Sequence, residues 1–196
     1  MDPRWSHIDS RVKLLTPDEL PDRPEGLSAA STLLWTGDQE VPDPHRESVI
    51  QDWMEAGGHL IVSIPDRGRG GRFARTGGSL HALLPDLPEQ EALYTSQILQ
   101  LLSPDQLRIT PGTEMTCRPF PATTTGTGPW HTVLNLPDGR PIAIARPVGH
   151  GRLTLIGLDL TSPIVQSARS DGAVQGPLPA AATFWNPVLA RRGDAP

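Results

Sequence analysis

Residues 43–65 carry the clearest structural signal of the chain: Asp-Pro-His-Arg-Glu-Ser-Val-Ile-Gln-Asp-Trp-Met-Glu-Ala-Gly-Gly-His-Leu-Ile-Val-Ser-Ile-Pro. The first half predicts a helix after Asp43, because an aspartate N-cap followed by proline is a common helix start. Gly57 and Gly58 supply its end. The apolar run 59–65 then follows at once, and such a run is typical of a strand buried on both faces of a parallel sheet.

Strands are predicted on both sides of this unit. One covers 32–36 and another, equally short, covers 11–15. Downstream, the segments 132–136 and 141–146 flank a Pro-Asp-Gly turn, which predicts an antiparallel hairpin. A further strand covers 152–158. Alternating strands and helices early in the chain, with strands late, favour an α/β fold: a three-layer sandwich with a mostly parallel central sheet and an antiparallel hairpin portion.

The middle of the chain gives weaker signals. Residues 89–102 carry apolar side chains at spacings that predict a helix, whereas 107–131 are dense in Thr, Pro and Gly and show no clean period. The 66–78 segment is rich in Gly and Arg, which predicts a loop.

Length and composition indicate one domain. The chain has 196 residues, is 37% hydrophobic and contains 22 Pro and 19 Gly, which fits a compact domain with long irregular connections. We expect a single domain over 1–196, in which 12–160 form the α/β body, 161–182 an irregular segment and 183–192 a closing helix.

Several classes of protein are disfavoured. No apolar run approaches the ~20 residues that span a bilayer, and the N-terminus does not resemble a signal peptide, so we expect a soluble chain. The single cysteine, Cys117, excludes an internal disulfide and a thiolate zinc cluster. The net charge of -5 argues against nucleic-acid binding by the whole domain. Compartment and oligomeric state stay open.

Two stretches resemble a known family. Trp53-Met-Glu-Ala-Gly-Gly-His-Leu-Ile-Val-Ser63 resembles the W-x-x-x-G-G-x-L core of class I glutamine-amidotransferase-like domains, and in particular the non-catalytic versions in uncharacterised bacterial cell-envelope proteins. Arg146-Pro-Val-Gly-His-Gly-Arg-Leu-Thr-Leu-Ile-Gly-Leu-Asp-Leu160 resembles the family's late strand pair, and Phe184-Trp185 its following aromatic pair. The resemblance spans roughly 12–190 and implies a flavodoxin-like, amidotransferase-like sheet.

The resemblance does not extend to catalysis. Catalytic members hold a cysteine in a tight strand-to-helix turn, activated by a histidine from a later strand. Here the strand over 60–64 is followed by Pro65-Asp66-Arg67-Gly68, with neither cysteine nor serine, and Asp159 stands where the histidine would be. We therefore expect no catalytic residues, no enzyme activity and no cofactor.

A basic segment follows the same strand. Within nine residues it carries four arginines: Arg67, Arg69, Arg72 and Arg75. Guanidinium groups grip carboxylate and phosphate at two points, and the intervening glycines free backbone amides to face an anion. The carboxyl edge of an α/β sheet is also where such folds bind ligands. A solvated Arg-Gly loop is the structural alternative. RNA is disfavoured because the segment offers only Phe73 for stacking.

Aspartates and the cysteine provide secondary candidates. Asp66 and Asp159, with Asp38, are expected near strand carboxyl ends, where a shared carboxylate site could transfer protons or hold a hard cation. Cys117 with a histidine would form a thiol site. Helix capping and simple burial are the corresponding structural interpretations. No two of the six histidines have i, i+4 spacing, so we expect no metal.

We therefore predict a non-catalytic, amidotransferase-like module that binds a protein partner or a small anionic ligand through the four arginines. The family resemblance implies association with a bacterial cell-envelope assembly. The alternative is a hydrolase-type enzyme with an unrecognised Asp- or Cys-based site.

Overall fold

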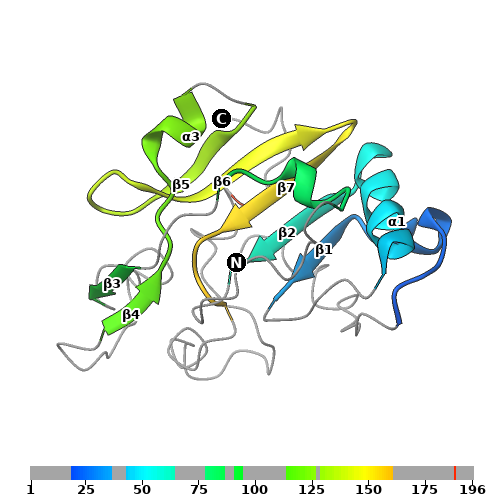
Figure 1. Ribbon diagram of the computed structural model, residues 1–196, viewed down its shortest axis with the longest axis horizontal. Coiled ribbons are helices and arrows are strands. Elements are labelled where there is room, and N and C mark those ends of the chain that lie inside the picture. The colour runs from blue at the N-terminus through cyan, green and yellow to red at the C-terminus, as the bar shows by residue number, and fades with distance from the viewer. Residues whose placement is uncertain are drawn as a thin grey trace, which may run out of the picture.

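The computed structural model describes residues 19–36, 43–64, 78–86, 91–94, 114–126, 129–160 and 188. Its main feature is a five-stranded sheet with the order β1-β2-β7-β6-β5 (Figure 1). The strands are β1 (Thr32–Trp35), β2 (His59–Ser63), β5 (His131–Asn135), β6 (Pro141–Val148) and β7 (Gly151–Ile156). β2 pairs in parallel with both β1 and β7, and β6 pairs antiparallel with both β7 and β5. Four strands thus point one way and β6 opposes them, which confirms the predicted α/β class.

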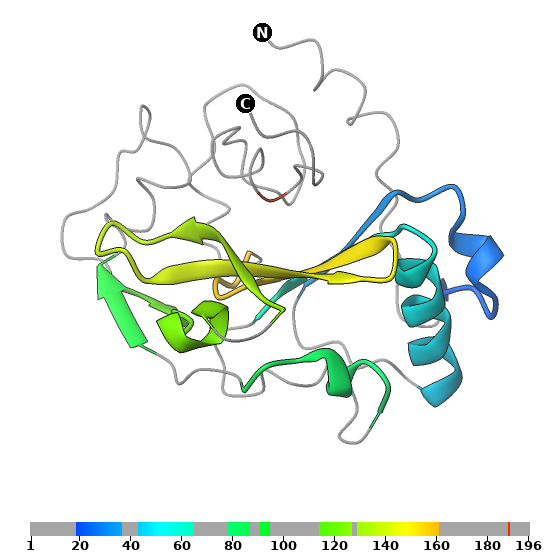
Figure 2. The same cartoon turned by 90° about the horizontal axis from the view of Figure 1, so that it is seen from above.

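Helix α1 (Pro44–Glu55) connects β1 to β2, as the sequence predicts. The Asp43 side chain caps it by accepting a hydrogen bond from the Arg46 backbone N–H at 2.9 Å. Gly57, with a φ of +124°, ends it in a backbone conformation that L side chains rarely adopt. Figure 2 shows α1 and the short helix α3 (Ala122–Gly126) on the same side of the sheet. Neither α1 nor α3 covers the opposite side, so these helices do not test the three-layer form of the prediction.

The predicted antiparallel hairpin is present as β5 and β6. Leu136 and Arg140 close it through a backbone hydrogen bond of 2.8 Å, and Gly139 adopts a φ of +86° within the turn. β7 then returns beside β6 after a tight turn in which Gly149 has a φ of +57°. The strands predicted at 32–36 and 152–158 are confirmed as β1 and β7.

The helix predicted over 89–102 is wrong where the structure describes it. Residues Glu91–Tyr94 form strand β3, which pairs antiparallel with β4 (Glu114–Cys117) in a separate two-stranded sheet. Short apolar runs cannot be assigned to helix or strand from spacing alone, because the strand partner decides. β4 and α3 both fall within 107–131, where no period was visible. Two short 3-10 helices, η2 (Pro24–Leu27) and η3 (His81–Leu83), complete the described elements.

The remaining secondary-structure predictions fall on segments that lie mostly outside the described residues. The strand predicted at 11–15, the loop at 66–78 apart from Gly78, and the irregular segment 161–182 lie outside the described residues. Val188 is the one described residue of the predicted closing helix 183–192, and it is helical and fully buried.

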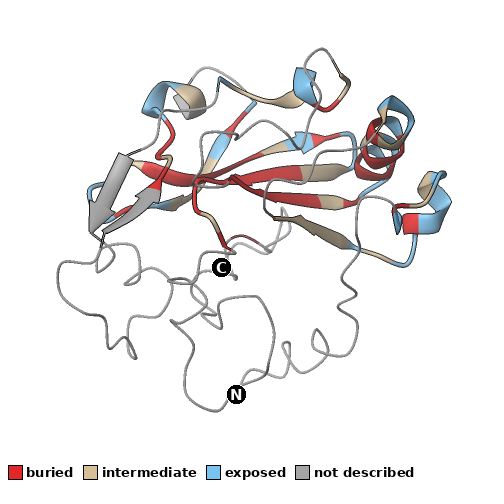
Figure 3. Ribbon diagram, turned by 60° about the horizontal axis from the view of Figure 1, so that its bottom comes forward, coloured by how far each residue is buried: buried red, intermediate tan, exposed pale blue. Residues whose placement is uncertain are grey.

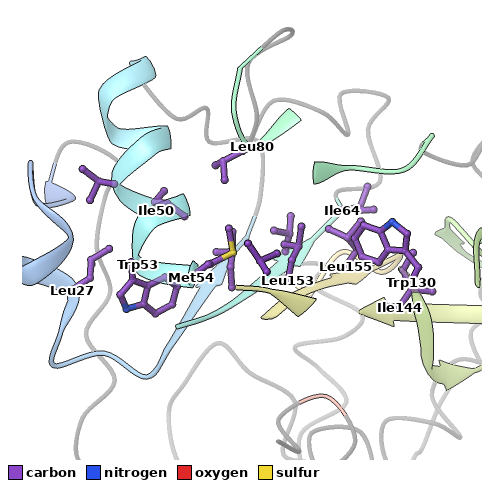
Figure 4. Close-up of a cluster of buried hydrophobic side chains, with 14 of the residues drawn as sticks. Leu27, Ile50, Trp53, Met54, Ile64, Leu80, Trp130, Ile144, Leu153 and Leu155 are labelled. Atoms are coloured by element: carbon purple, nitrogen blue, oxygen red, sulfur yellow. The ribbon is translucent and has the colours of Figure 1, made fainter. Parts of the chain in front are cut away.

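The hydrophobic core lies between α1 and the sheet. Figure 4 shows Trp53 and Met54 of α1 in one buried cluster with Leu153 and Leu155 of β7. The central strands are buried along most of their length (Figure 3). On β2, Leu60 and Val62 join this core, while Ile61 between them is also buried, so both faces of the strand are covered. None of the described helices is long and apolar enough to cross a membrane.

Candidate functional site

The three parallel strands end together at one edge of the sheet. Trp35 of β1 is the last residue in register with β2, and Ser63 at the end of β2 pairs with Ile156 at the end of β7. Figure 1 shows the arrowheads of β1, β2 and β7 pointing to this side of the molecule. In open α/β sheets, the crevice outside these carboxyl ends is the usual ligand site. The candidate site is therefore this carboxyl edge, with β2 at its centre.

Ser63 fastens the segment beyond β7 to the end of β2. Its side chain is buried, donates a hydrogen bond to the Leu158 carbonyl at 2.7 Å and accepts one from the Leu160 N–H at 3.0 Å. These two bonds use the hydroxyl proton and one of its lone pairs. Sequence reasoning did not single out Ser63. The available signal is one polar residue within the otherwise apolar run 60–64.

Asp159 lies between the two residues that Ser63 holds. It is partly buried and stands three positions beyond the last residue of β7. Because Leu158 and Leu160 are both bound to Ser63, the backbone on each side of Asp159 is fixed beside the end of β2. The structure thus places Asp159 at the carboxyl edge, as the sequence predicts.

Cys117 reaches the same edge from the two-stranded sheet. It forms an isolated antiparallel bridge with Leu158, and the neighbouring Arg118 N–H donates to the Gly157 carbonyl at 2.8 Å. A Cβ on Gly157 would lie 2.1 Å from the Arg118 carbonyl oxygen, so this approach requires glycine. The Cys117 side chain is only 2% exposed. That burial favours a small packing residue over an accessible nucleophile.

The arginines predicted to bind an anion lie outside the described residues: Arg67, Arg69, Arg72 and Arg75. Asp66 and Asp38 lie outside the described residues as well. Of the three aspartates predicted to lie close together, only Asp159 is therefore placed by the structure. The structure does place Ile64, the last described residue before the basic segment. Ile64 donates its N–H to the Ile156 carbonyl at 2.9 Å, immediately before the undescribed stretch.

Three residues of the family-like stretches, Trp53, Gly58 and Gly151, lie at the other end of the strands. A Cβ on Gly58 would fall 2.2 Å from the Trp53 ring, and one on Gly151 would fall 2.2 Å from the Gly58 carbonyl oxygen. The Trp53 indole N–H donates to the Ala30 carbonyl at 3.1 Å. These residues join α1 to the amino ends of β2 and β7. Their spacing is explained by close packing, and they place no chemical group at the carboxyl edge.

The polar residues at this amino end are also structural. His59 begins β2 and is hydrogen-bonded through Nε2 to the Thr154 hydroxyl at 2.8 Å. Burial, and secondarily the positive charge of Arg152, lowers the pKa of His59 to about 4, so the ring is neutral at pH 7. Burial also lowers the pKa of Arg152. Among the described residues, no group of three or more His, Cys, Asp or Glu side chains could hold a metal ion.

No family model and no curated protein matches the chain. Among solved structures, the exo-β-1,4-mannosidase Op5Man5 from Opitutaceae bacterium strain TAV5 is similar at 15% identity and a TM-score of 0.49. The match covers 83% of this chain and 26% of the mannosidase, so the chain spans about a quarter of that protein's length.

Two cytoplasmic proteins of Salmonella typhimurium are similar as well. STM1381 from strain LT2 has 15% identity and a TM-score of 0.49, and STM3548 has 12% identity and a TM-score of 0.47. Each match covers 86% of this chain and 74% of the Salmonella protein. None of these three structures carries the name of a glutamine amidotransferase, and we draw nothing about function from them. The amidotransferase-like assignment stays a prediction.

Proposed function

We propose that this chain is a non-catalytic, amidotransferase-like module that binds an anionic ligand, or an acidic surface of a protein partner, at the carboxyl edge of its sheet. The contacts are assigned to the four arginines of the basic segment: Arg67, Arg69, Arg72 and Arg75. Association with a bacterial cell-envelope assembly is the part of this proposal that rests on the family resemblance alone.

One observation carries the proposal. β2 is flanked by parallel strands on both sides, and the basic segment begins at Arg67, three residues after Ile64, the last described residue beyond β2. A segment that leaves the middle of a parallel sheet at its carboxyl edge starts where α/β folds gather their ligands. Four guanidinium groups in that position favour a carboxylate or phosphate over a neutral ligand.

The reactive groups described at this edge support a binding role over the hydrolase alternative. The Ser63 hydroxyl is buried and hydrogen-bonded to two backbone groups, so it lacks the exposure of an activated nucleophile. Cys117 is buried. The hydrolase alternative requires Asp159 to act with Asp66, or Cys117 with a histidine.

A thermal-shift screen tests the proposal. The purified chain is heated with phosphate, nucleotides, dicarboxylates, acidic peptides and vesicles of acidic lipid. A ligand that binds only the folded state stabilises it by about 2.7 kcal/mol at 100 times its dissociation constant, which gives a readily visible shift. The variant Arg67→Ala/Arg69→Ala should lose that shift.

The control removes the same charge elsewhere. Arg23 is exposed beside η2, and Arg140 forms an exposed ion pair with Asp138 in the hairpin turn. Arg23→Ala/Arg140→Ala should keep the ligand shift. Equal losses in both double variants would reveal nonspecific charge attraction, and no shift with any anion would overturn the small-ligand form of the proposal.

A further inference from the structure

The turn of the β5–β6 hairpin contains a dipeptide that can react with itself. Asp138 is followed by Gly139, and both residues are exposed. In such a pair the Gly139 backbone nitrogen can attack the side-chain carbon Cγ of Asp138, because glycine has no Cβ to crowd the approach. The product is a five-membered succinimide ring. The hairpin turn therefore presents a modification site that needs no enzyme.

The reaction is balanced by the loss and return of one water molecule. A bond forms between the Gly139 nitrogen and Cγ, while the carboxyl OH and the amide proton leave as water. Water then opens the ring at one of its two carbonyl carbons. Attack at Cγ restores aspartate. Attack at the main-chain carbonyl carbon breaks its bond to the nitrogen and leaves isoaspartate, in which the main chain runs through Cγ.

Both reacting groups are bound to other partners in the folded chain. The Gly139 N–H donates a hydrogen bond to the Leu136 carbonyl at 2.9 Å within the turn. The Asp138 carboxylate accepts one from the Arg140 backbone N–H at 3.0 Å and one from the Arg140 Nε at 2.8 Å. Ring closure requires the nitrogen and Cγ to meet in a reactive geometry. The folded turn must therefore give up these bonds before it reacts.

Arg140 also holds the carboxyl group in its less reactive form. Ring closure proceeds through the protonated carboxyl, because a carboxylate has no OH that can leave as water. The backbone hydrogen bond from Arg140, and then the Arg140 guanidinium, keep the pKa of Asp138 below its ordinary value against a smaller opposing effect of desolvation. At pH 7 the reactive form is therefore scarcer than it would be without Arg140.

We propose that Asp138 and Gly139 form an isoaspartate site, and that Arg140 keeps its reaction slow while the hairpin is folded. This inference is independent of the proposed function. β5 pairs only with β6 among the described strands, and this turn joins the two. Isoaspartate adds one atom to the main chain of the turn, so the modification loosens this edge of the sheet first.

Incubation of the full chain at pH 7 over several weeks tests the site. An endoprotease that cuts before aspartate does not cut before isoaspartate, so mass spectrometry of the digest follows the loss of cleavage before Asp138. Arg140→Gln removes the guanidinium charge and keeps the backbone N–H. It should isomerise about two- to fivefold faster than the native chain, a range that corresponds to the strength of an exposed ion pair. Arg140→Lys keeps a positive charge and should react at an intermediate rate.

Three controls assign the effect to the ion pair. Arg23→Gln removes an exposed arginine beside η2 and should leave the rate at Asp138 unchanged. The chain contains a second Asp-Gly pair at 171–172, whose rate should be the same in the native chain and in Arg140→Gln. In concentrated urea the turn is lost, so both chains should react at Asp138 at one common, faster rate.

Two outcomes would overturn the inference. Equal rates for the folded native chain and folded Arg140→Gln would show that Arg140 does not restrain the reaction. Complete cleavage before Asp138 in every chain, including the chains kept in urea, would show that no isoaspartate forms there. If Arg140→Gln does not fold, the comparison of the native chain with Arg140→Lys decides in the same way.

Discussion

The His59 ring and the Thr154 hydroxyl, 95 residues apart in the chain, are hydrogen-bonded at 2.8 Å across β2 and β7. Thr154 is fully buried and lies in the strand next to His59. The bond therefore holds a titratable, partly buried ring at the amino end of the central strand. Because burial and the charge of Arg152 lower the pKa of this histidine to about 4, the folded protein holds it neutral.

This arrangement predicts acid sensitivity below pH 6.5. The folded pKa of about 4 lies below the ordinary value of 6.5, so between these values the unfolded chain binds more protons. The free energy of unfolding should fall as the pH drops from 6.5 to 4, by roughly 3 kcal/mol from this group. Urea denaturation at pH 7, 5.5 and 4.5 measures the loss.

His59→Gln should reduce that pH dependence, since it removes the titrating ring. His150 is exposed in the turn before β7, and His150→Gln serves as the control that should retain it. An unchanged slope in His59→Gln would show that other groups cause the acid loss.

The contact between Gly58 and Trp53 gives a second prediction. Gly58→Ala introduces a Cβ 2.2 Å from the indole ring, so the ring must move out of the core. We expect a loss of about 3 kcal/mol in the free energy of unfolding. Gly139→Ala is the comparison: its φ of +86° is strained for alanine, but nothing lies within 4 Å, so about 1–2 kcal/mol is expected.

A double variant identifies the cause of the Gly58 effect. In Gly58→Ala/Trp53→Leu the smaller side chain leaves room for the added methyl group, so the two losses should be less than additive. Chemical denaturation of the native chain, the two single variants and the double variant measures the coupling energy between the two positions. Strict additivity would indicate that the alanine acts through the backbone and not through the ring.

The same contact shows why the sequence predicted the fold better than the site. The spacing of Trp53 and Gly58 reports a local packing requirement, and Asp43 reports a local cap, so both can be recognised from neighbouring residues. Strand β3 depends on partners in β4 that are 20 to 26 residues away, and no local pattern reveals them. Its apolar spacing was therefore assigned wrongly to a helix.

The candidate site depends on long-range contacts as well. Asp159 could be predicted because it follows a strand, which places it at the carboxyl edge. Ser63 could not, because its function lies in bonds to residues 95 and 97 positions away. For the four arginines, the anion-binding prediction comes from the sequence. The structure adds only that the described chain before their segment ends at the carboxyl edge.

Ser63→Ala tests the importance of those two bonds. The variant leaves the Leu158 carbonyl and the Leu160 N–H without this buried partner, and each lost partner costs about 1–3 kcal/mol. We expect a combined loss of about 3 kcal/mol in thermal or urea denaturation. Ser48→Ala removes an exposed serine bond to Pro44 and should cost far less. Similar losses in both variants would contradict the fastening role of Ser63.

Cys117 distinguishes the binding module from a thiol enzyme. Its side chain is 2% exposed and its backbone bridges to Leu158, so a thiol reagent should reach it only when the chain opens locally. We expect labelling of the native chain by a maleimide to be at least tenfold slower than labelling in denaturant. Cys117→Ala should also leave anion binding unchanged. Labelling as fast in the native chain as in denaturant would mean that the thiol is accessible, and loss of ligand binding in Cys117→Ala would place it in the site. Either result would favour the hydrolase alternative over the binding module.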